Sequence, residues 1–410
     1  MDCPDRERAQ WWWDAALEIG ESFYALDAKS HLLAKKAMLE LTAWQKSDGT
    51  LYSPVPSGNW SIELPAQMLA SIGWYGFYTY YLNTGDSETI KAVYPAARRY
   101  IGLWKMNEKG IVTIRKGGWN WGDWGQNVDM ELLTNAWYYL ALKSLEQMAF
   151  ITKPGDAKAF GEKMRLMEKG FNKYFWNGSA YRSPGYKGKT DDRGNALAVC
   201  ARLAENAFYP AIREVLLSQY HASPGLEKHV DEALFIMGYD KDALLRMKKR
   251  FKEMVDAPYS TFWEGWEIGS IEYGGGTYNH AWSGGSLTLL SMYAAGIRPT
   301  RPGYTEYEVM PQMGSLNKIL CTVPSVKGAI KVELEKKDKN FRLSLQSPQE
   351  TTTIVGIPAE YTGNIRVADK SGKTYDVINS PPSSIISLGV DGGFRKFKTA
   401  SGKWIFLTGK

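Results

Sequence analysis

Apolar residues recur at helical spacing from near the start of the chain to about Ala295. After Asp14, for example, Ile19, Phe23 and Leu26 fall on one face of a helix. Gly- and Pro-rich connections separate the helical segments, and no strand pattern lies between them. This order predicts an array of α-hairpins closed on itself. The predicted helical segments are Asp14–Gln45, Leu64–Asn83, Ser87–Met106, Met130–Ile151, Ala157–Tyr174, Asn195–Glu205, Pro210–Tyr220, Leu226–Met237, Lys241–Val255 and His280–Ala295.

The period changes after residues 296–299. From Tyr304 to Lys410 the chain is rich in Thr, Val and Ile in alternating patterns, and Lys331–Glu335 and Phe341–Leu345 flank a polar turn as in a hairpin. An antiparallel β-sandwich is the simplest fold for this stretch. We therefore predict a mainly α chain with two domains, a helical domain over residues 1–300 and a sandwich over 301–410.

The charge pattern excludes some partners. The formal net charge is +6, but Lys and Arg are interleaved with Asp and Glu along the whole chain. Such mixing is typical of a solvated surface, so we expect no nucleic-acid partner. No basic-then-apolar leader opens the chain, and apolar stretches such as Ala136–Leu142 are too short for a membrane span. The sequence leaves the oligomeric state open, and the compartment between periplasm and cytoplasm.

Cofactor chemistry has little support in the sequence. Cys3, Cys200 and Cys321 are far apart and lack zinc-site spacing, so we read them as free thiols. His is scarce, and His31, His221 and His229 fall on predicted helices or their edges. No acidic loop has calcium spacing, and the glycine run at residues 274–276 is better read as a pocket loop than a phosphate site. We expect no metal and no cofactor.

The aromatic content indicates a carbohydrate partner. The chain has 16 Trp and 24 Tyr, clustered locally with Gly, Asn and Asp. Their faces stack on the apolar faces of sugar rings while their polar edges stay wet. An aromatic core would explain Trp104 or Trp137 on helices, but it explains the Trp119–Trp124 cluster poorly.

The first fourteen residues combine acids, arginines and tryptophans. The segment Asp2–Arg8 reads Asp-Cys-Pro-Asp-Arg-Glu-Arg and is followed by Trp11–Asp14. It resembles the Asp-x-Pro-x-Arg-Glu-Arg…Trp…Asp signature of the α-L-rhamnosidase family of glycoside hydrolases, family 78. The resemblance implies that Glu7 is the general acid and that Asp2, Arg6, Trp11 and Asp14 bind the sugar.

Two of these residues, Glu7 and Asp14, also have a plainer interpretation. A Glu between two Arg is usually a surface ion pair, and the arginines lower its pKa, whereas a general acid needs a raised pKa. Asp14 opens a helical pattern and is a good N-cap, a role compatible with sugar binding. The family usually has Gly where Trp13 stands, so this chain has a bulky side chain where a close approach of the backbone was expected.

A second segment, Ser260–Glu267, resembles the family's Thr-Thr-x-Trp-Glu-x-Trp sequence, which carries the general base. The resemblance places Glu264 as base and Trp263 in the sugar pocket, with Glu267 as a competing base. The family commonly has Arg where Gly265 stands. A tryptophan precedes each glutamate, and an apolar wall is what raises a carboxyl pKa.

Other segments extend the resemblance. Tyr278–Trp282 contains the family's Asn-His-Ala, which implies that His280 binds substrate, although a single His is more often a hydrogen-bonded core residue. Gly122–Trp124 matches a Gly-Asp-Trp of a loop facing the active site, which implies binding roles for Asp123 and Trp124; a loop tryptophan sealing the barrel end is the alternative. Trp60 is a weaker member of this group.

The resemblance implies a fold and a reaction. The family has an (α/α) six-hairpin toroid followed by a β-domain, with its acidic signature after the first barrel helix. Since one residue precedes Asp2, we expect that helix and the upstream domains to be absent. The expected activity is inverting release of terminal α-L-rhamnose. The alternatives are an (α/α)-barrel glycosidase of other sugar specificity and a non-catalytic carbohydrate-binding fragment.

Overall fold

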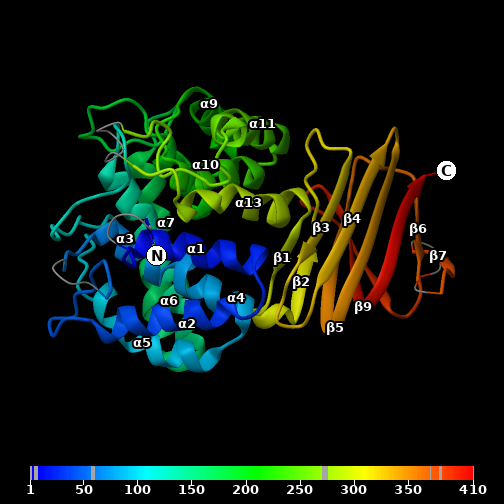
Figure 1. The fold of residues 1–410 in the computed structure, drawn as a ribbon, viewed down its shortest axis with the longest axis horizontal. Helices are drawn as coiled ribbons and strands as arrows, with labels where there is room; N and C mark the ends of the chain where they lie inside the picture. Colours follow the sequence, from blue (N-terminus) through cyan, green and yellow to red (C-terminus); the bar gives the residue numbers. More distant parts are fainter. Residues whose placement is uncertain are drawn as a thin grey trace. The chain divides into compact units, whose positions relative to one another are not determined.

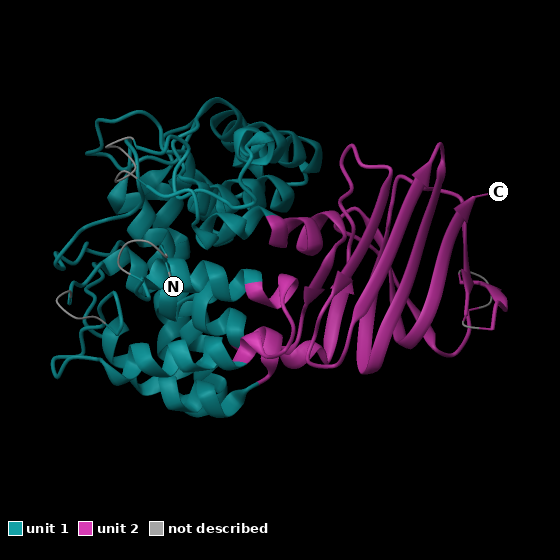
Figure 2. Cartoon of the chain, viewed as in Figure 1, with its two compact units in different colours: residues 1–21, 32–80, 86–286 teal, residues 22–31, 81–85, 287–410 magenta. Residues whose placement is uncertain are grey.

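The computed structural model describes residues 2–3, 8–56, 61–269, 276–369, 371–377 and 381–409 (Figure 1). The chain divides into two compact units (Figure 2). The first, helical unit holds the residues up to Glu21, Leu32–Tyr80 and Asp86–Ser286, and the second, the sheet unit, holds Ser22–His31, Tyr81–Gly85 and Leu287–Lys410. The domain border predicted at residue 300 stays a prediction.

Each predicted helical segment contains helix, but three are interrupted: Leu64–Asn83 at Gly73, Lys241–Val255 at Phe251, and Asp14–Gln45 after Ala25. Asp14–Gln45 is two helices, because Asp27 makes a turn: its Oδ1 accepts from the Lys29 backbone N–H at 2.9 Å, and its carbonyl accepts from the Ser30 hydroxyl at 2.8 Å. The α-helices are α1 Trp12–Ala25, α2 Ser30–Ala43, α3 Pro65–Ile72, α4 Thr79–Thr84, α5 Ser87–Ile101, α6 Met130–Thr152, α7 Pro154–Phe175, α8 Asp192–Cys200, α9 Tyr209–Ser218, α10 Pro224–Ile236, α11 Asp240–Arg250, α12 Lys252–Asp256 and α13 Gly285–Leu289. The short helical turns are η1 Trp74–Tyr78, η2 Asn206–Phe208, η4 Ala281–Gly284, η5 Leu290–Ala294 and η6 Pro302–Tyr304.

The longest helix, α6, is central to the helical unit. Most of its side chains are buried, from Leu132 to Ala149, and it packs against α3, α5, α7 and α8. The N-cap Asp129 starts it, with its carboxylate accepting from the Leu132 N–H. Among the described residues, no helix is both long and apolar enough to span a bilayer.

The strands of the second unit form one hydrogen-bonded sheet among the described residues. The predicted hairpin is confirmed, since β4 and β5 pair antiparallel with Glu335 opposite Arg342. One pair, β2 with β5, is parallel, while the other pairs are antiparallel. The strands are β1 Ile297–Pro299, β2 Glu306–Val309, β3 Lys318–Val323, β4 Ile330–Lys337, β5 Asn340–Pro358, β6 Asn364–Ala368, β7 Thr374–Asp376, β8 Ile385–Asp391 and β9 Phe394–Gly409.

Two long strands, β5 and β9, run through both layers of this sheet. The first half of β5 pairs with β4 and with the end of β9, and its second half pairs with β2 and with the start of β9. The pairing register shifts between Ser347 and Thr352, where Pro348 has no N–H to donate and Glu350 has φ 57°. Leu343 of the first half and Val355 of the second belong to one buried apolar cluster. A single sheet bent at this irregularity therefore encloses the core of the sandwich.

Candidate active site

The opening segment folds back on itself. The Asp2 N–H donates to the Ala9 carbonyl at 3.0 Å, and Asp2 Oδ1 accepts from the Ala9 N–H at 3.1 Å. Both residues are buried. Two hydrogen bonds therefore join Asp2 to Ala9. The predicted acid Glu7, and with it Arg6 and Trp60, lie outside the described residues.

Helix α1 brings Asp14 to the site, although not as the N-cap that we expected. The helix begins at Trp12, whose N–H donates to the Ser53 hydroxyl at 2.9 Å, so a side chain from a distant segment caps it. Trp11 is half-buried just before this start. Asp14 is the third residue, in the first turn, where the partial positive charge of the helix N-terminus favours a carboxylate.

Asp14 and His280 face each other in the interior of the helical unit. His280 Nε2 lies 3.4 Å from Asp14 Oδ1, and the two residues are only 3% and 6% exposed. Burial raises the pKa of Asp14 well above its ordinary value, and the charges of Glu18, Asp2 and Glu264 raise it further. Three other predicted site residues, namely Asp2, Glu264 and His280, thus come within electrostatic or contact reach of Asp14.

Two main-chain hydrogen bonds join the segment that carries Glu264 to the segment that carries His280. The Glu264 N–H donates to the Thr277 carbonyl at 2.9 Å, and the His280 N–H donates to the Phe262 carbonyl at 2.9 Å. The Thr277 hydroxyl donates to Glu264 Oε2 at 3.5 Å. The candidate base and the candidate sugar-binding histidine are therefore positioned by the same pair of segments.

Exposure separates the two glutamates that competed for the role of base. Glu264 is 2% exposed, whereas Glu267 is exposed to solvent. The tryptophans that precede the two glutamates share one small apolar cluster. Trp263 packs there with Phe251 and Met254, and Trp266 packs against them. The predicted role of Trp263 in substrate binding stays a prediction.

A row of tryptophans connects the site with the surface, and of its members only Trp124 was predicted to bind substrate. The Trp282 indole N–H donates to the Glu264 carbonyl at 3.1 Å, and its ring centroid lies 4.9 Å from that of His280. Trp121 stacks on Trp282 at 6.3 Å and 23°, and Trp124 lies 5.7 Å from Trp121. Trp282 belongs to a segment that carries the family resemblance and Trp121 directly precedes another, which is the signal that could have identified them.

The row ends at Trp119. Its ring lies 5.8 Å from Trp124, and it is 39% exposed. Aromatic faces with a wet edge suit a sugar or an aryl group.

Asp123 is engaged in a buried ion pair. Its Oδ2 lies 3.1 Å from Arg193 Nη1 and accepts from the Ser223 N–H at 2.9 Å, and both charged side chains are fully buried. Burial raises the pKa of Asp123 to about 6, against the opposing charge of Arg193. Arg193 also donates to the carbonyls of Trp124 and Gln126. The pair fixes the tryptophan loop to α8, and the predicted binding role of Asp123 stays a prediction.

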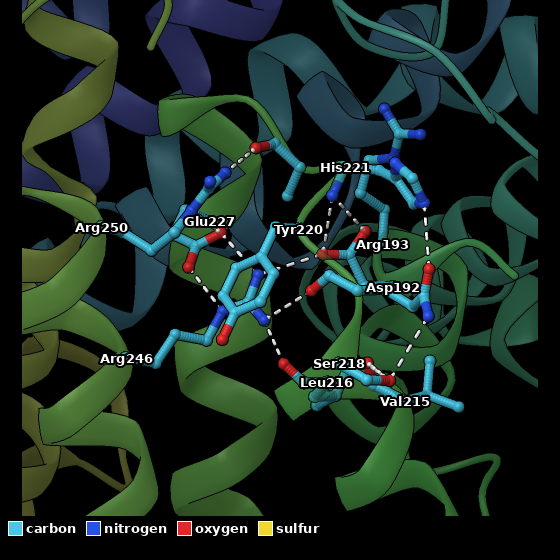
Figure 3. Close-up of polar contacts among 12 residues, drawn as sticks. Asp192, Arg193, Val215, Leu216, Ser218, Tyr220, His221, Glu227, Arg246 and Arg250 are labelled. Carbon is cyan, nitrogen blue, oxygen red and sulfur yellow. Dashed lines mark hydrogen bonds and ion pairs between the residues drawn. The ribbon is translucent and has the colours of Figure 1, made fainter. Parts of the chain in front are cut away.

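A second buried network ties three helices together (Figure 3). Arg246 of α11 donates to both carboxylate oxygens of Glu227 on α10, at 2.6 and 3.0 Å, and to Asp192 of α8 at 3.0 Å. Arg250 adds a contact to Glu227 at 3.5 Å, and the His221 N–H donates to Asp192. Burial alone would raise the pKa of Asp192, but Arg246 outweighs it, so the pKa lies below its ordinary value.

Within the candidate site, the described residues bring together no metal-ligating trio. Elsewhere in the described part of the chain, Cys200, His229 and Glu232 lie close enough together to hold a metal ion. They lie apart from Asp14 and Glu264 in the sequence.

Comparison with known protein families assigns both parts of the chain. Residues 1–293 match the bacterial alpha-L-rhamnosidase 6 hairpin glycosidase domain, and residues 296–372 match the bacterial alpha-L-rhamnosidase C-terminal domain. A curated relative, the alpha-L-rhamnosidase of Streptomyces avermitilis, is 22% identical over 390 residues, which cover 89% of this chain and 36% of the relative.

Solved structures share the fold. An alpha-L-rhamnosidase from Dictyoglumus thermophilum aligns with a TM-score of 0.84 and 22% identity, over 100% of this chain and 47% of that one. The Streptomyces avermitilis alpha-L-rhamnosidase complexed with L-rhamnose aligns with a TM-score of 0.79 and 17% identity, over 98% and 38%. The predicted fold class, a helical six-hairpin domain followed by a sheet domain, is confirmed. The chain spans less than half the length of these relatives.

Proposed function

Because the chain belongs to the bacterial α-L-rhamnosidase family, glycoside hydrolase family 78, we propose that it releases terminal α-L-rhamnose from glycosides by inversion at the anomeric carbon. Glu264 would act as general base and Glu7 as general acid. The observation that carries the proposal is the buried group formed by Glu264, Asp14 and His280. Its members come from an opening helix and from a segment about 250 residues later.

The chemistry assigns a step to each carboxyl group. The Glu264 carboxylate takes a proton from water, whose oxygen attacks C1 of the sugar as the glycosidic bond breaks. Glu7 gives a proton to the leaving oxygen on the opposite face. An inverting site needs roughly 6.5–9.5 Å between its two carboxyl groups, so that the water fits between base and sugar.

The remaining residues would bind and orient the sugar. A protonated Asp14 can donate to a ring hydroxyl, which its raised pKa favours, and His280 can accept or donate beside it. The stacked pair Trp121 and Trp282 would line the apolar side of the ring. A deoxy sugar with a C6 methyl group suits such a wall.

The test is hydrolysis of p-nitrophenyl α-L-rhamnopyranoside by the full chain, with the anomer of the released sugar followed by NMR. Glu264→Gln should lower kcat by about 10²–10⁴-fold. Glu267→Gln is the matched control, since it makes the same change on an exposed glutamate of the same segment, and it should leave kcat unchanged.

The outcomes separate the competing functions. Release of β-rhamnose that depends on Glu264 supports the proposal, whereas α-rhamnose as first product refutes inversion. Turnover of a different aryl sugar supports the alternative specificity. A folded chain that binds rhamnose without turnover is a carbohydrate-binding fragment.

A further inference from the structure

A buried cluster outside the proposed sugar site combines three different metal-ligating side chains. Cys200 ends α8, while His229 and Glu232 lie three residues apart on one face of α10. All three are buried, and one ligand atom from each lies within 4.8 Å of the other two. The Cys200 thiol already points at this part of α10, since it donates to the His229 carbonyl at 3.4 Å.

The separation between His229 and Glu232 fits a shared ion better than a hydrogen bond. His229 Nδ1 lies 3.8 Å from Glu232 Oε2, which is beyond hydrogen-bond distance. Zinc bonds of about 2.0–2.3 Å in a tetrahedral site place ligand atoms about 3.3–3.8 Å apart. The two side chains therefore already stand near the spacing of two ligands on one ion.

An unsatisfied ring nitrogen points independently to a ligand. His229 is 1% exposed, and its Nδ1 has no hydrogen-bond partner in the described part of the chain. A buried polar nitrogen without a partner costs about 1–3 kcal/mol. A metal ion would satisfy it, because neutral imidazole is a common zinc ligand.

We propose that Cys200, His229 and Glu232 form a structural site for a divalent ion of the zinc class. Thiolate, imidazole and carboxylate are the ligands that zinc takes in proteins. The charges balance: two positive charges on the ion meet one on the thiolate and one on the carboxylate, so the buried site is neutral. Binding breaks the S–H bond of Cys200, whose proton leaves to solvent as the sulfur–metal bond forms.

The surroundings of the cluster already orient the carboxylate. The Tyr75 hydroxyl of η1 donates to Glu232 Oε2 at 2.9 Å, and the Tyr75 ring lies 4.5 Å from the His229 ring. The hydrogen bond from Tyr75 therefore holds the Glu232 carboxylate in place beside His229. The ion would join α8, α10 and, through Tyr75, η1.

The experiment measures metal in the full chain produced in minimal medium supplemented with Zn²⁺ or with Co²⁺. We expect one ion per chain by mass spectrometry. The cobalt form should show a thiolate-to-cobalt charge-transfer band in the near ultraviolet. Cys200→Ser should lose both the band and the ion, and Cys321→Ser, which removes a thiol from the sheet unit, should keep both.

Two further variants keep the test decisive. Tyr75→Phe should retain the band and weaken Co²⁺ binding by about 10–100-fold, as expected for a group that orients a ligand. If Cys200→Ser does not fold, His229→Gln replaces it, and the spectrum of the unmodified cobalt form decides whether sulfur is bound. A chain that carries no ion from either medium, or equal metal content with and without Cys200, overturns the proposal.

Discussion

Arg246 is the residue whose removal should destabilise the helical unit most clearly. Its guanidinium makes three charge-assisted hydrogen bonds to Glu227 and Asp192 and donates to the carbonyls of Leu216 and Gln219. Both carboxylates are fully buried. The substitution Arg246→Met keeps an unbranched side chain but leaves these two negative charges without their principal partner.

The expected loss of unfolding free energy depends on the contacts that Glu227 and Asp192 keep in the variant. Removing one partner of a buried ion pair typically costs about 3–5 kcal/mol. Arg250 still contacts Glu227 at 3.5 Å, and the His221 N–H still donates to Asp192. We therefore expect the lower end of that range, about 3 kcal/mol of unfolding free energy.

Urea unfolding followed by tryptophan fluorescence measures this loss. Of the 16 tryptophans, only Trp404 lies in the sheet unit, so the signal reports chiefly on the helical unit. The matched control is Lys91→Met, which removes an exposed ion pair with Glu88 and should cost at most about 1 kcal/mol.

Two results would refute the reasoning. One is an equal loss of unfolding free energy in Arg246→Met and Lys91→Met, which would mean that burial does not decide the cost. The other concerns the double variant Arg246→Met/Glu227→Leu. It should be less destabilised than the sum of its two single variants, because Glu227 then leaves no charge behind, and simple additivity would contradict this.

Three further predictions concern the site and its supports. Ser53→Ala removes the hydroxyl that caps α1 at Trp12 and should cost about 1 kcal/mol in urea unfolding; an unchanged midpoint would contradict the capping role. Trp282→Phe removes the donor to the Glu264 carbonyl, worth about 1 kcal/mol, and should lower kcat on the aryl rhamnoside by about 5- to 10-fold, whereas unchanged kcat would mean that the bond does not position the base. Burial and its acidic neighbour raise the pKa of Glu21 from 4.5 to about 8, so the folded chain holds this proton more tightly and its unfolding free energy should fall as pH rises from 4.5 to 8. Glu21→Gln should flatten that fall, and an equal slope in both proteins would contradict it.

The local parts of the fold could be predicted from the sequence. The alternation in Lys331–Glu335 and Phe341–Leu345 specifies both strands and their pairing, because the two strands are joined by a short polar turn. The break between α1 and α2 was missed, since the apolar period continues across Asp27 while a side-chain turn interrupts the backbone.

Interactions between distant segments could not be predicted. Nothing near Trp12 in the sequence indicates that Ser53 caps its helix. Nothing in the sequence indicates that Arg193 pairs with Asp123. Cys200 and His229 have no metal-site spacing, because their proximity depends on how α8 packs against α10.

Burial distinguishes residues that sequence motifs leave equivalent. Glu264 and Glu267 occupy similar sequence contexts, each after a tryptophan. Only the three-dimensional pairing of residues 262–264 with 277–280 encloses one of them and leaves the other in water.

The shared strands of the sandwich determine where the chain can be shortened. The match to the C-terminal domain of the family ends at residue 372, yet β9 begins at Phe394 and pairs with β5 in both layers. A chain ended at 372 would expose the edge of β5 that pairs with β9 and would leave β6 without both of its neighbours, β7 and β9. A version of this domain that keeps its sheet paired must therefore extend through β9, because a boundary at residue 372 leaves the edge of β5 open to pairing with another chain.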